Sequence, residues 1–483
     1  EVVVRMPATM PWVLETSQWP EKNSERLTLT DTVENGQRTI RAVFHDREGY
    51  IPEQNMLPRY RIFPRLLMSP QHSWETIAQE LDKGLASVAP SPELLAAFVQ
   101  ESGAMKVSGD FEKARTLYDY LLRRIQMVGV GLGDYGRYVP PSIDGVLTKK
   151  YASAFARVAL MHFALKKLGI ASAIGFVDAW QDGGLKERIP SLGQAADALL
   201  RVSLDGRTLY LTLDSDYLSF GVLHTGYQGA RAGFLINGRI VFETLPEGLE
   251  WNRADQQVFV KVLADGSFEV KDLRNFRGIH EPGLRGLRSA KEKKKLQWAQ
   301  GLVKRIHPKA ELIDYSLTDV NDLTAPLSLA LTYRIPDAAI KAGENLLAFK
   351  NLWVRYGAGS ASLEKRKYPM EYYAWSDSAN NIVFELPDGF RWVPWGRTFN
   401  YACGFLSYAS NLMQNGRMVS FSDRLTVQRK ELDVIDAYPH YRGCLTRMAD
   451  LSNQWMIIER VAVATPSAAS ATVNPASGVT PTK

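Results

Sequence analysis

The chain has 483 residues, which is too long for one ordinary hydrophobic core and predicts two or three domains. Hydrophobic residues make up 45% and charged residues 23% of the sequence, the proportions of a globular protein. The 58 Lys and Arg residues exceed the 52 Asp and Glu residues by a net charge of only +6, an excess too small to indicate a nucleic-acid partner.

The two ends of the sequence differ in character. The start, EVVVRMPA, is typical of a strand already under way and carries no signal-peptide pattern, so we expect a processed or truncated start. No apolar run approaches the roughly 20 residues that a membrane-spanning helix needs, so we expect no transmembrane segment. Residues 461–483 are rich in Ala, Ser, Thr and Pro and predict a disordered tail.

Strand patterns come first along the chain, and helical patterns follow. Residues 1–67 alternate strand-like segments and end in a proline-punctuated linker, which predicts the C-terminal portion of an N-terminal β-rich domain. From Ser73 to Leu168 the pattern is helical, with Ser73 as the first N-cap. The segment DFEKARTLYDYLLRRIQMV places its apolar residues on one helix face: Ala114, Leu117, Leu121, Leu122 and Ile125.

The segment 152–168 predicts a helix that is buried on most of its circumference. The N-terminus of such a helix offers unpaired N–H groups and a partial positive charge, which lower the pKa of a thiol and stabilise an oxyanion. The residues at this position are Ala152, Ser153 and Ala154, so no thiol is available. His162 lies roughly 12 Å further along the axis, and we expect it to be a histidine with satisfied hydrogen bonds beside the core.

A β-hairpin is predicted at 197–214, because Asp205-Gly206 suits a two-residue type I′ turn. This turn places Leu204 opposite Arg207 and makes one side of the hairpin apolar. Asp197 and Thr212 then become diagonal neighbours on the other side, within about 8 Å of each other.

From 231 to 460 strand patterns dominate, interrupted by one helix near 285–306. The aromatic residues between YYAWSDSANN and NYACGF could stack on sugar rings, but sandwich cores use aromatics as well. Cys403 and Cys444 are compatible with a disulfide or with two free buried thiols. We expect no metal and no cofactor, since no His, Cys, Asp or Glu grouping has zinc-ligand spacing and no glycine-rich loop suits a nucleotide.

The sequence resembles the bacterial transglutaminase-like proteins of the papain-like thiol superfamily. More narrowly, it is similar to the secreted subgroup whose core lies between two β-rich domains. The resemblance runs through PRLLMSPQHSWETIAQEL and through ARTLYDYLLRRIQMVGVGLGDYGRYVPPSIDGVLTKKY. Counted from Tyr151, the family cysteine falls on Ala154, and the Gly-Ile after the family helix falls on Gly169-Ile170. The family histidine falls on Asp197 and the family aspartate on Thr212.

The resemblance implies an α+β fold with a degenerate papain- or transglutaminase-like core at 68–230, flanked by antiparallel β-sandwich-type domains. Residues 231–460 would form the C-terminal β-rich domain. The former substrate cleft would be lined by five residues: Tyr151, Ser153, Trp180, Tyr210 and Asp214.

A thiol transferase or protease needs a nucleophile within hydrogen-bond reach of a base, and both are replaced here. We therefore predict a non-catalytic binding or scaffolding module that is periplasmic or extracellular. Its partner would be a protein or peptide, or alternatively a polysaccharide. One alternative is a hydrolase with a relocated nucleophile, Ser153, assisted by Asp197, Asp214 or His224. Another is a structural component of an envelope or extracellular assembly.

Overall fold

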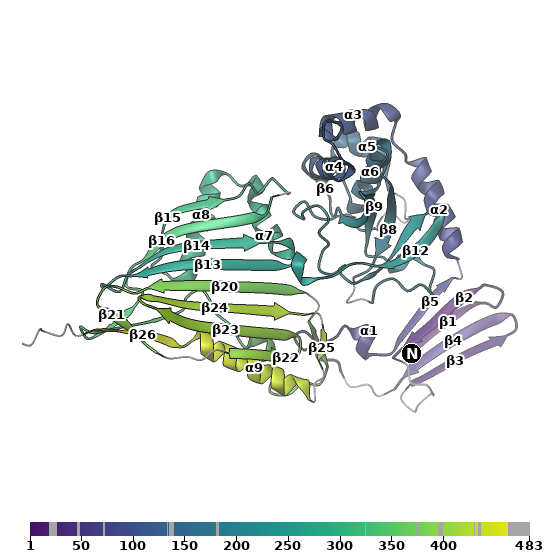
Figure 1. Cartoon of the computed structure of the whole chain (residues 1–483). Coiled ribbons are helices and arrows are strands. Elements are labelled where there is room, and N and C mark those ends of the chain that lie inside the picture. The colour runs from purple at the N-terminus through teal and green to yellow at the C-terminus, as the bar shows by residue number, and fades with distance from the viewer. Residues whose placement is uncertain are drawn as a thin grey trace, which may run out of the picture.

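The protein has an α+β fold, seen in a computed structural model (Figure 1). The structure describes residues 1–18, 27–45, 49–70, 73–132, 134, 140–179, 183–323, 325–372, 375–394, 399–428, 430–432 and 436–461. The predicted tail at 461–483 lies outside the described residues, apart from Val461. None of the described helices is both long and apolar enough to span a bilayer.

The N-terminal part is built from short antiparallel strands. β1 (Val2–Pro7), β4 (Gln37–Phe44) and β3 (Leu27–Glu34) form one sheet in that order, with Ile40 and Ala42 buried in it. β2 (Trp12–Ser17) pairs with β5 (Arg65–Pro70), beyond the short helix α1 (Arg59–Ile62). The proline-punctuated linker therefore leads into a strand that returns to the N-terminal part.

Helices and a five-stranded sheet make up the core. The described helices are α2 (Trp74–Ser87), α3 (Pro92–Ser102), α4 (Asp110–Arg124), α5 (Ile143–Lys149) and α6 (Ala154–Lys167). The described strands of the sheet are all antiparallel, in the order β10 (Arg207–Thr212), β9 (Asp197–Leu204), β8 (Ser172–Val177), β11 (Arg231–Ile236) and β12 (Arg239–Thr244). Helix α6 packs on β8 and β9 and is buried along most of its length, as its composition predicts.

The sheet of the core extends past residue 230. β11 pairs with β8, with Phe234 opposite Gly175, so the hairpin 231–244 completes this sheet. The predicted domain boundary at 230 thus falls in front of two strands that share the core sheet. Strand patterning identifies these segments as strands but does not say which sheet they join.

The C-terminal part is a sandwich of two unequal sheets (Figure 1). The larger has eight described strands in the order β15 (Glu311–Leu317), β16 (Leu327–Ile335), β14 (Phe268–Phe276), β13 (Arg253–Val262), β20 (Ser376–Glu385), β24 (Met418–Val427), β23 (Leu406–Asn415) and β22 (Phe399–Cys403). The smaller is β17 (Ile340–Ala342), β18 (Leu346–Lys350), β26 (Trp455–Arg460) and β21 (Phe390–Val393). Together with α8 (Glu292–Ile306), the smaller sheet buries the apolar residues on one face of the larger one. A separate pair, β19 (Met370–Tyr372) and β25 (Lys430–Leu432), lies beside α9 (Ala437–Ser452).

Two details of this part differ from the sequence-based expectation. β13 and β20 pair in parallel, so the larger sheet is not wholly antiparallel. Helix α9 is a second long helix, where only the one near 285–306 is predicted. Its sequence, AYPHYRGCLTRMADLS, contains Pro439 and Gly443, two residues that weaken a helical pattern.

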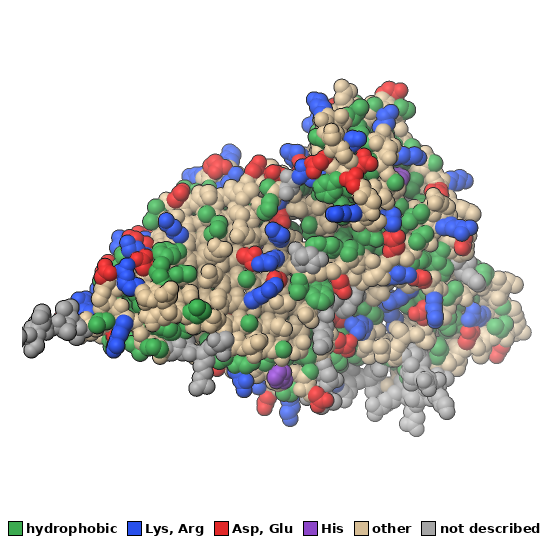
Figure 2. Space-filling view, viewed as in Figure 1, with side chains coloured by type: hydrophobic (Ala, Val, Ile, Leu, Met, Phe, Trp, Pro, Cys, Tyr) green, Lys and Arg blue, Asp and Glu red, His purple; other side chains and the backbone are tan. Residues whose placement is uncertain are grey.

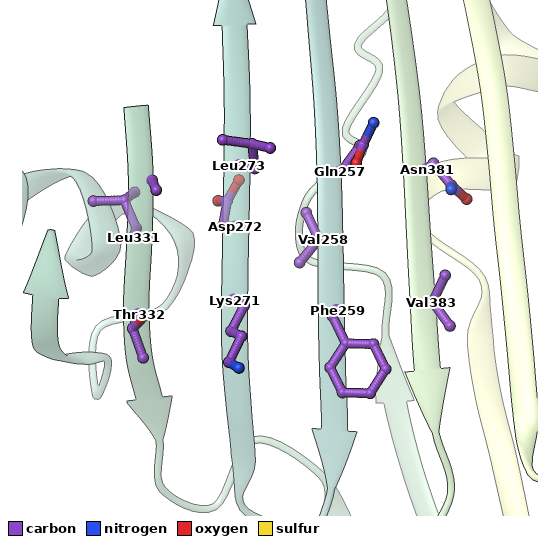
Figure 3. A pocket seen from close by; sticks show the side chains of 11 residues that line it. Gln257, Val258, Phe259, Lys271, Asp272, Leu273, Leu331, Thr332, Asn381 and Val383 are labelled. Carbon is purple, nitrogen blue, oxygen red and sulfur yellow. The ribbon is translucent and has the colours of Figure 1, made fainter. Parts of the chain in front are cut away.

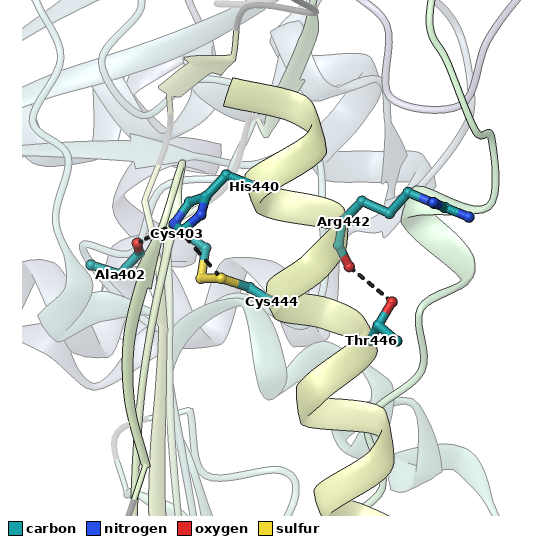
Figure 4. Close-up of a disulfide and its surroundings, with 6 residues drawn as sticks. All are labelled: Ala402, Cys403, His440, Arg442, Cys444 and Thr446. Atoms are coloured by element: carbon teal, nitrogen blue, oxygen red, sulfur yellow. Dashed lines mark hydrogen bonds between the residues drawn. A yellow bond between two sulfur atoms is a disulfide. The ribbon is translucent and has the colours of Figure 1, made fainter. Parts of the chain in front are cut away.

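A disulfide joins Cys403 at the end of β22 to Cys444 in α9 (Figure 4), which settles the alternatives left open by the sequence. It fastens the helix to an edge strand of the larger sheet. His440, one turn before Cys444, brings its ring within 3.9 Å of Cys444 Sγ. The potential ligand atoms of these three residues lie within 4.8 Å of one another, a grouping that sequence spacing does not reveal. Because the sulfurs are bonded to each other, this group offers only an imidazole as a metal ligand.

Candidate functional site

Helix α6 begins at Ala154. At this position the sequence predicts a residue that cannot act as a nucleophile. Lys150 adopts a left-handed conformation (φ 63°) and ends α5, and the chain then turns into α6. Ser153 is the N-cap, since its Oγ accepts a hydrogen bond from the Ala156 N–H at 3.3 Å. Ser153 is 2% exposed and Ala154 6% exposed. The serine oxygen therefore serves the helix and is shielded from solvent.

Arg157, one turn into α6, connects the helix start to the end of the hairpin. Its buried guanidinium donates to the Leu213 carbonyl at 3.3 Å and to the Ile125 carbonyl, and it lies 2.7 Å from an Asp216 carboxylate oxygen. Burial lowers the pKa of Arg157, and the Asp216 carboxylate opposes that effect. The signal in the sequence for this connection between α6 and the hairpin is Arg157 itself, a charged residue in the first turns of a mainly apolar helix.

The hairpin has the predicted register. Leu204 pairs with Arg207 and Thr212 pairs with Leu199, which leaves Asp197 at the open end of β9 as a diagonal neighbour of Thr212. Thr212 is 1% exposed, and its Oγ1 has no hydrogen-bond partner among the described residues. Because Arg157 binds the residue next to Thr212, the start of α6 and the end of β10 converge.

Asp197 is a carboxyl group in this region whose protonation is strongly perturbed by its surroundings. Burial, aided by the nearby Asp214 carboxylate, raises the pKa of Asp197 to about 7. Its carboxylate oxygens accept hydrogen bonds from the Ala198 N–H at 2.8 Å and from the Tyr227 hydroxyl at 3.4 Å. A carboxyl group that titrates near neutrality can move protons.

The predicted cleft residues within the described part of the chain differ widely in exposure. Tyr151 is 48% exposed beside the start of α6, whereas Ser153 is buried. Tyr210 is half-buried and donates its hydroxyl hydrogen bond to Glu243 at 2.7 Å. Asp214 is half-buried just after β10. Trp180 lies outside the described residues.

Two histidines of the core, His162 and His224, differ in their surroundings. The His162 ring is 2.9 Å from Ser172 Oγ, and burial lowers the pKa of His162 to about 4, in line with the prediction of a satisfied histidine. His224, proposed as an alternative base, is exposed in a turn, where its Nδ1 accepts from the Gly226 N–H at 3.2 Å.

A second surface is the face of the larger sheet that α8 leaves uncovered. A shallow hollow of about 380 Å³ lies over neighbouring strands there. Figure 3 shows Phe259 and Val383 beside the amides of Gln257 and Asn381 and the Lys271 side chain. Figure 2 shows few charged side chains over the middle of these strands.

The aromatic segments that suggested sugar stacking are used mainly inside the fold. Tyr372 stacks on Phe405 with ring centroids 5.2 Å apart, and Trp392 is buried. Tyr373 and Trp395 lie outside the described residues. The sequence left open whether these aromatic residues stack on sugars or pack within the fold, and Tyr372 and Trp392 pack within it.

Comparison with known proteins identifies a fold but no family. No protein-family model matches the chain, and a search of curated proteins finds no match. A crystal structure of a candidate protease from Parabacteroides distasonis ATCC 8503 is similar, with a TM-score of 0.61 and 13% identity, covering 95% of this chain and 71% of that one. At this identity the similarity establishes a shared fold. A structure of a TGase gives a TM-score of 0.21 and 10% identity over 41% of this chain and 50% of that one, which is too low to establish even that.

Proposed function

We propose that this chain is a non-catalytic transglutaminase-like protein that acts as a binding or scaffolding module in the cell envelope or outside the cell. The observation that carries the proposal is Ala154 at the first position of α6, where papain-like enzymes place their cysteine. The resemblance to that family puts Asp197 and Thr212 at the positions of the base and of the orienting carboxylate. An oxidised Cys403–Cys444 pair supports a location outside the reducing cytoplasm.

The partner proposed for the core is a protein or peptide that contacts the exposed side of Tyr151. Because Ser153, Ala154 and Thr212 are buried, such a segment would lie across the start of α6 without entering it. A polysaccharide is a second candidate partner, favoured by the hollow around Phe259 on the uncovered sheet face. The small net charge gives no support for a nucleic-acid partner.

The relocated-nucleophile alternative has weaker support. Ser153 Oγ is engaged as an N-cap and is shielded, and His224 is exposed in a turn with its Nδ1 already accepting a hydrogen bond. A role as an assembly component remains compatible with the sandwich. Light scattering of the purified chain separates the two roles, since an assembly component forms large oligomers and a monomeric binder does not.

The absence of catalysis is tested with a fluorophosphonate probe and with an amine-incorporation assay. The wild-type chain is expected to give neither labelling nor transamidation, and Ser153→Ala is expected to behave identically. Labelling of the wild type that Ser153→Ala abolishes would contradict the proposal in favour of a serine hydrolase.

The family relationship is tested by restoring the thiol. The sequence contains two cysteines, and both are in the disulfide, so Ala154→Cys introduces the single free thiol. We expect its pKa to lie below the ordinary value of about 8.5, because it sits at a helix N-terminus beside a buried guanidinium. Ala159→Cys, buried in the middle of the same helix, is the control and should have a raised pKa. Thiolate absorbance against pH measures both, and equal pKa values would contradict the relationship.

Binding at the core is tested by photo-crosslinking. A benzophenone amino acid at Tyr151 is expected to capture a partner from the native envelope fraction, and the same group at exposed Leu296 on α8 is the control. Equal capture at both positions would show that the start of α6 is not a binding surface.

A further inference from the structure

A hollow of about 310 Å³ lies where the core meets the C-terminal sandwich. From the core, Phe111 at the start of α4 and Phe220 in the loop after β10 line it. From the other side come Trp251 in the short helix η4 (Leu249–Trp251) and Arg277, which follows β14. Its volume is at the lower end for ligand sites and suits a group about the size of one amino acid.

Aromatic rings form the apolar wall of this junction pocket. Phe111 and Phe220 meet edge to face with centroids 5.4 Å apart, and Phe220 packs in the same way on buried Tyr118. Phe111 nevertheless remains 39% exposed, so an apolar ligand would cover it. Gly278 has φ +63°, and a Cβ there would lie 1.3 Å from the Trp251 carbonyl oxygen, so only glycine lets the Trp251 backbone approach this closely.

The floor of the junction pocket is a buried ion pair whose two side chains already make hydrogen bonds within the protein. Arg285 donates to the Glu281 carboxylate at 2.7 Å and to the Asp322 carbonyl at 2.8 Å. Glu281 also accepts from the Ser219 hydroxyl at 2.8 Å and from the Gly278 N–H at 3.1 Å. Among the described lining residues Glu281 is the acid, and these donors neutralise its charge. A negative ligand would therefore meet no uncompensated carboxylate.

Two further arginines line the pocket, and one of them has no acidic partner among the described residues. The Arg115 Nε is buried and has no hydrogen-bond partner within the described chain, although the far end of its guanidinium pairs with Glu112. The exposed Arg277 side chain has no ion pair with any described residue. Guanidinium groups bind carboxylates with paired hydrogen bonds, which makes a carboxylate the matching anion.

We infer that the junction pocket binds a carboxylate carried by an aromatic or branched apolar group. The apolar part would lie on Phe111, Phe220 and Trp251, and the carboxylate would pair with Arg277 and Arg115. The C-terminal residue of a peptide and a free aromatic acid present the same chemistry. This inference concerns a site away from the start of α6 and does not depend on the proposed function.

The test is isothermal titration calorimetry of the full chain with N-acetyl-phenylalanine. Its neutral amide, N-acetyl-phenylalaninamide, is the charge control and should bind at least about tenfold more weakly. Acetyl-Ala-Ala-Phe and phenylpropionate distinguish the sources, because a peptide site favours the former and a site for free acids the latter. No heat from the carboxylate up to about 10 mM, or equal affinity for acid and amide, would overturn the inference.

Variants locate the site. Arg277→Gln should weaken N-acetyl-phenylalanine by about tenfold or more, since it removes one exposed cation without touching the core. Arg115→Gln should weaken it as well. Arg305→Gln, an exposed arginine in the last turn of α8, is the matched control and should leave affinity unchanged. If Arg305→Gln weakens binding as much as Arg277→Gln does, the attraction is general and the assigned site is wrong.

Discussion

Asp197 lies at the start of β9 with its carboxyl group largely withdrawn from water, and this couples folding to pH. Its pKa of about 7 in the folded protein lies above the ordinary value of 3.8. The folded state therefore holds this proton more tightly than the unfolded state does. The stabilisation from this group is complete below about pH 4 and is lost as the pH rises toward 7.

Replacing Asp197 with Asn should remove that pH dependence. We expect Asp197→Asn to raise the free energy of unfolding at pH 8 by on the order of 3 kcal/mol and to change it little at pH 4. Chemical denaturation at both pH values measures this. Asp205→Asn at the exposed hairpin turn is the matched control, and an equal response of the two variants would show that burial of Asp197 is not the cause.

The sequence predicts where the residues of this region lie in their helix and hairpin, but it does not predict which other segments surround them. The sequence predicts that the buried helix begins near Ala154, and the structure agrees, because helix starts follow local rules. The register from Asp205-Gly206 placed Asp197 diagonal to Thr212, because a two-residue turn fixes the pairing. The burial of both residues depends on segments distant in sequence, such as the one carrying Tyr227, and local patterns contain no information about them.

Among the elements, α9 depends most on a covalent bond. The disulfide closes a sequence separation of 41 residues and joins the helix to β22. Replacing both Cys403 and Cys444 with Ala should lower the free energy of unfolding by about 3 kcal/mol, chiefly because the unfolded chain regains freedom. Thermal denaturation with and without a thiol reductant measures the loss. The wild type should be sensitive to the reductant and the double variant insensitive, and a wild type indifferent to reductant would contradict the assigned role.

Element prediction succeeded where caps and periodicity were strong. Helices α2 and α6 have Ser73 and Ser153 as N-caps that accept backbone hydrogen bonds, and the sequence predicts the first of these caps. Helix α9 was missed, since Pro439 and Gly443 interrupt its pattern and Asp436 makes no side-chain cap. The parallel pairing of β13 with β20 was also beyond the sequence, because alternation within a strand does not identify its neighbour.

At the scale of the whole molecule, a chain of charges ties the core to the C-terminal part. Arg157 in α6 lies 2.7 Å from one Asp216 oxygen, and Arg288 of the C-terminal part lies 3.2 Å from the other. Asp216→Asn should cost on the order of 3 kcal/mol, because it leaves the buried Arg157 without a counter-charge. It should also speed proteolysis between 245 and 252, where the two parts connect. Asp205→Asn is again the control, and cleavage at the wild-type rate would show that Asp216 does not hold the parts together.

The parallel pairing of β13 and β20 also governs how the sandwich can assemble. Arg253 pairs with Asp377, so within the larger sheet two blocks of antiparallel described strands, one in 253–335 and one in 376–427, are joined by the parallel pairing of β13 with β20. During synthesis the first block can form while β13 still presents unpaired backbone groups, and these stay open to a neighbouring nascent chain until β20 emerges. Closing so long a loop is slow. The seam between β13 and β20 is therefore the place where premature termination or delayed folding would turn this protein toward aggregation.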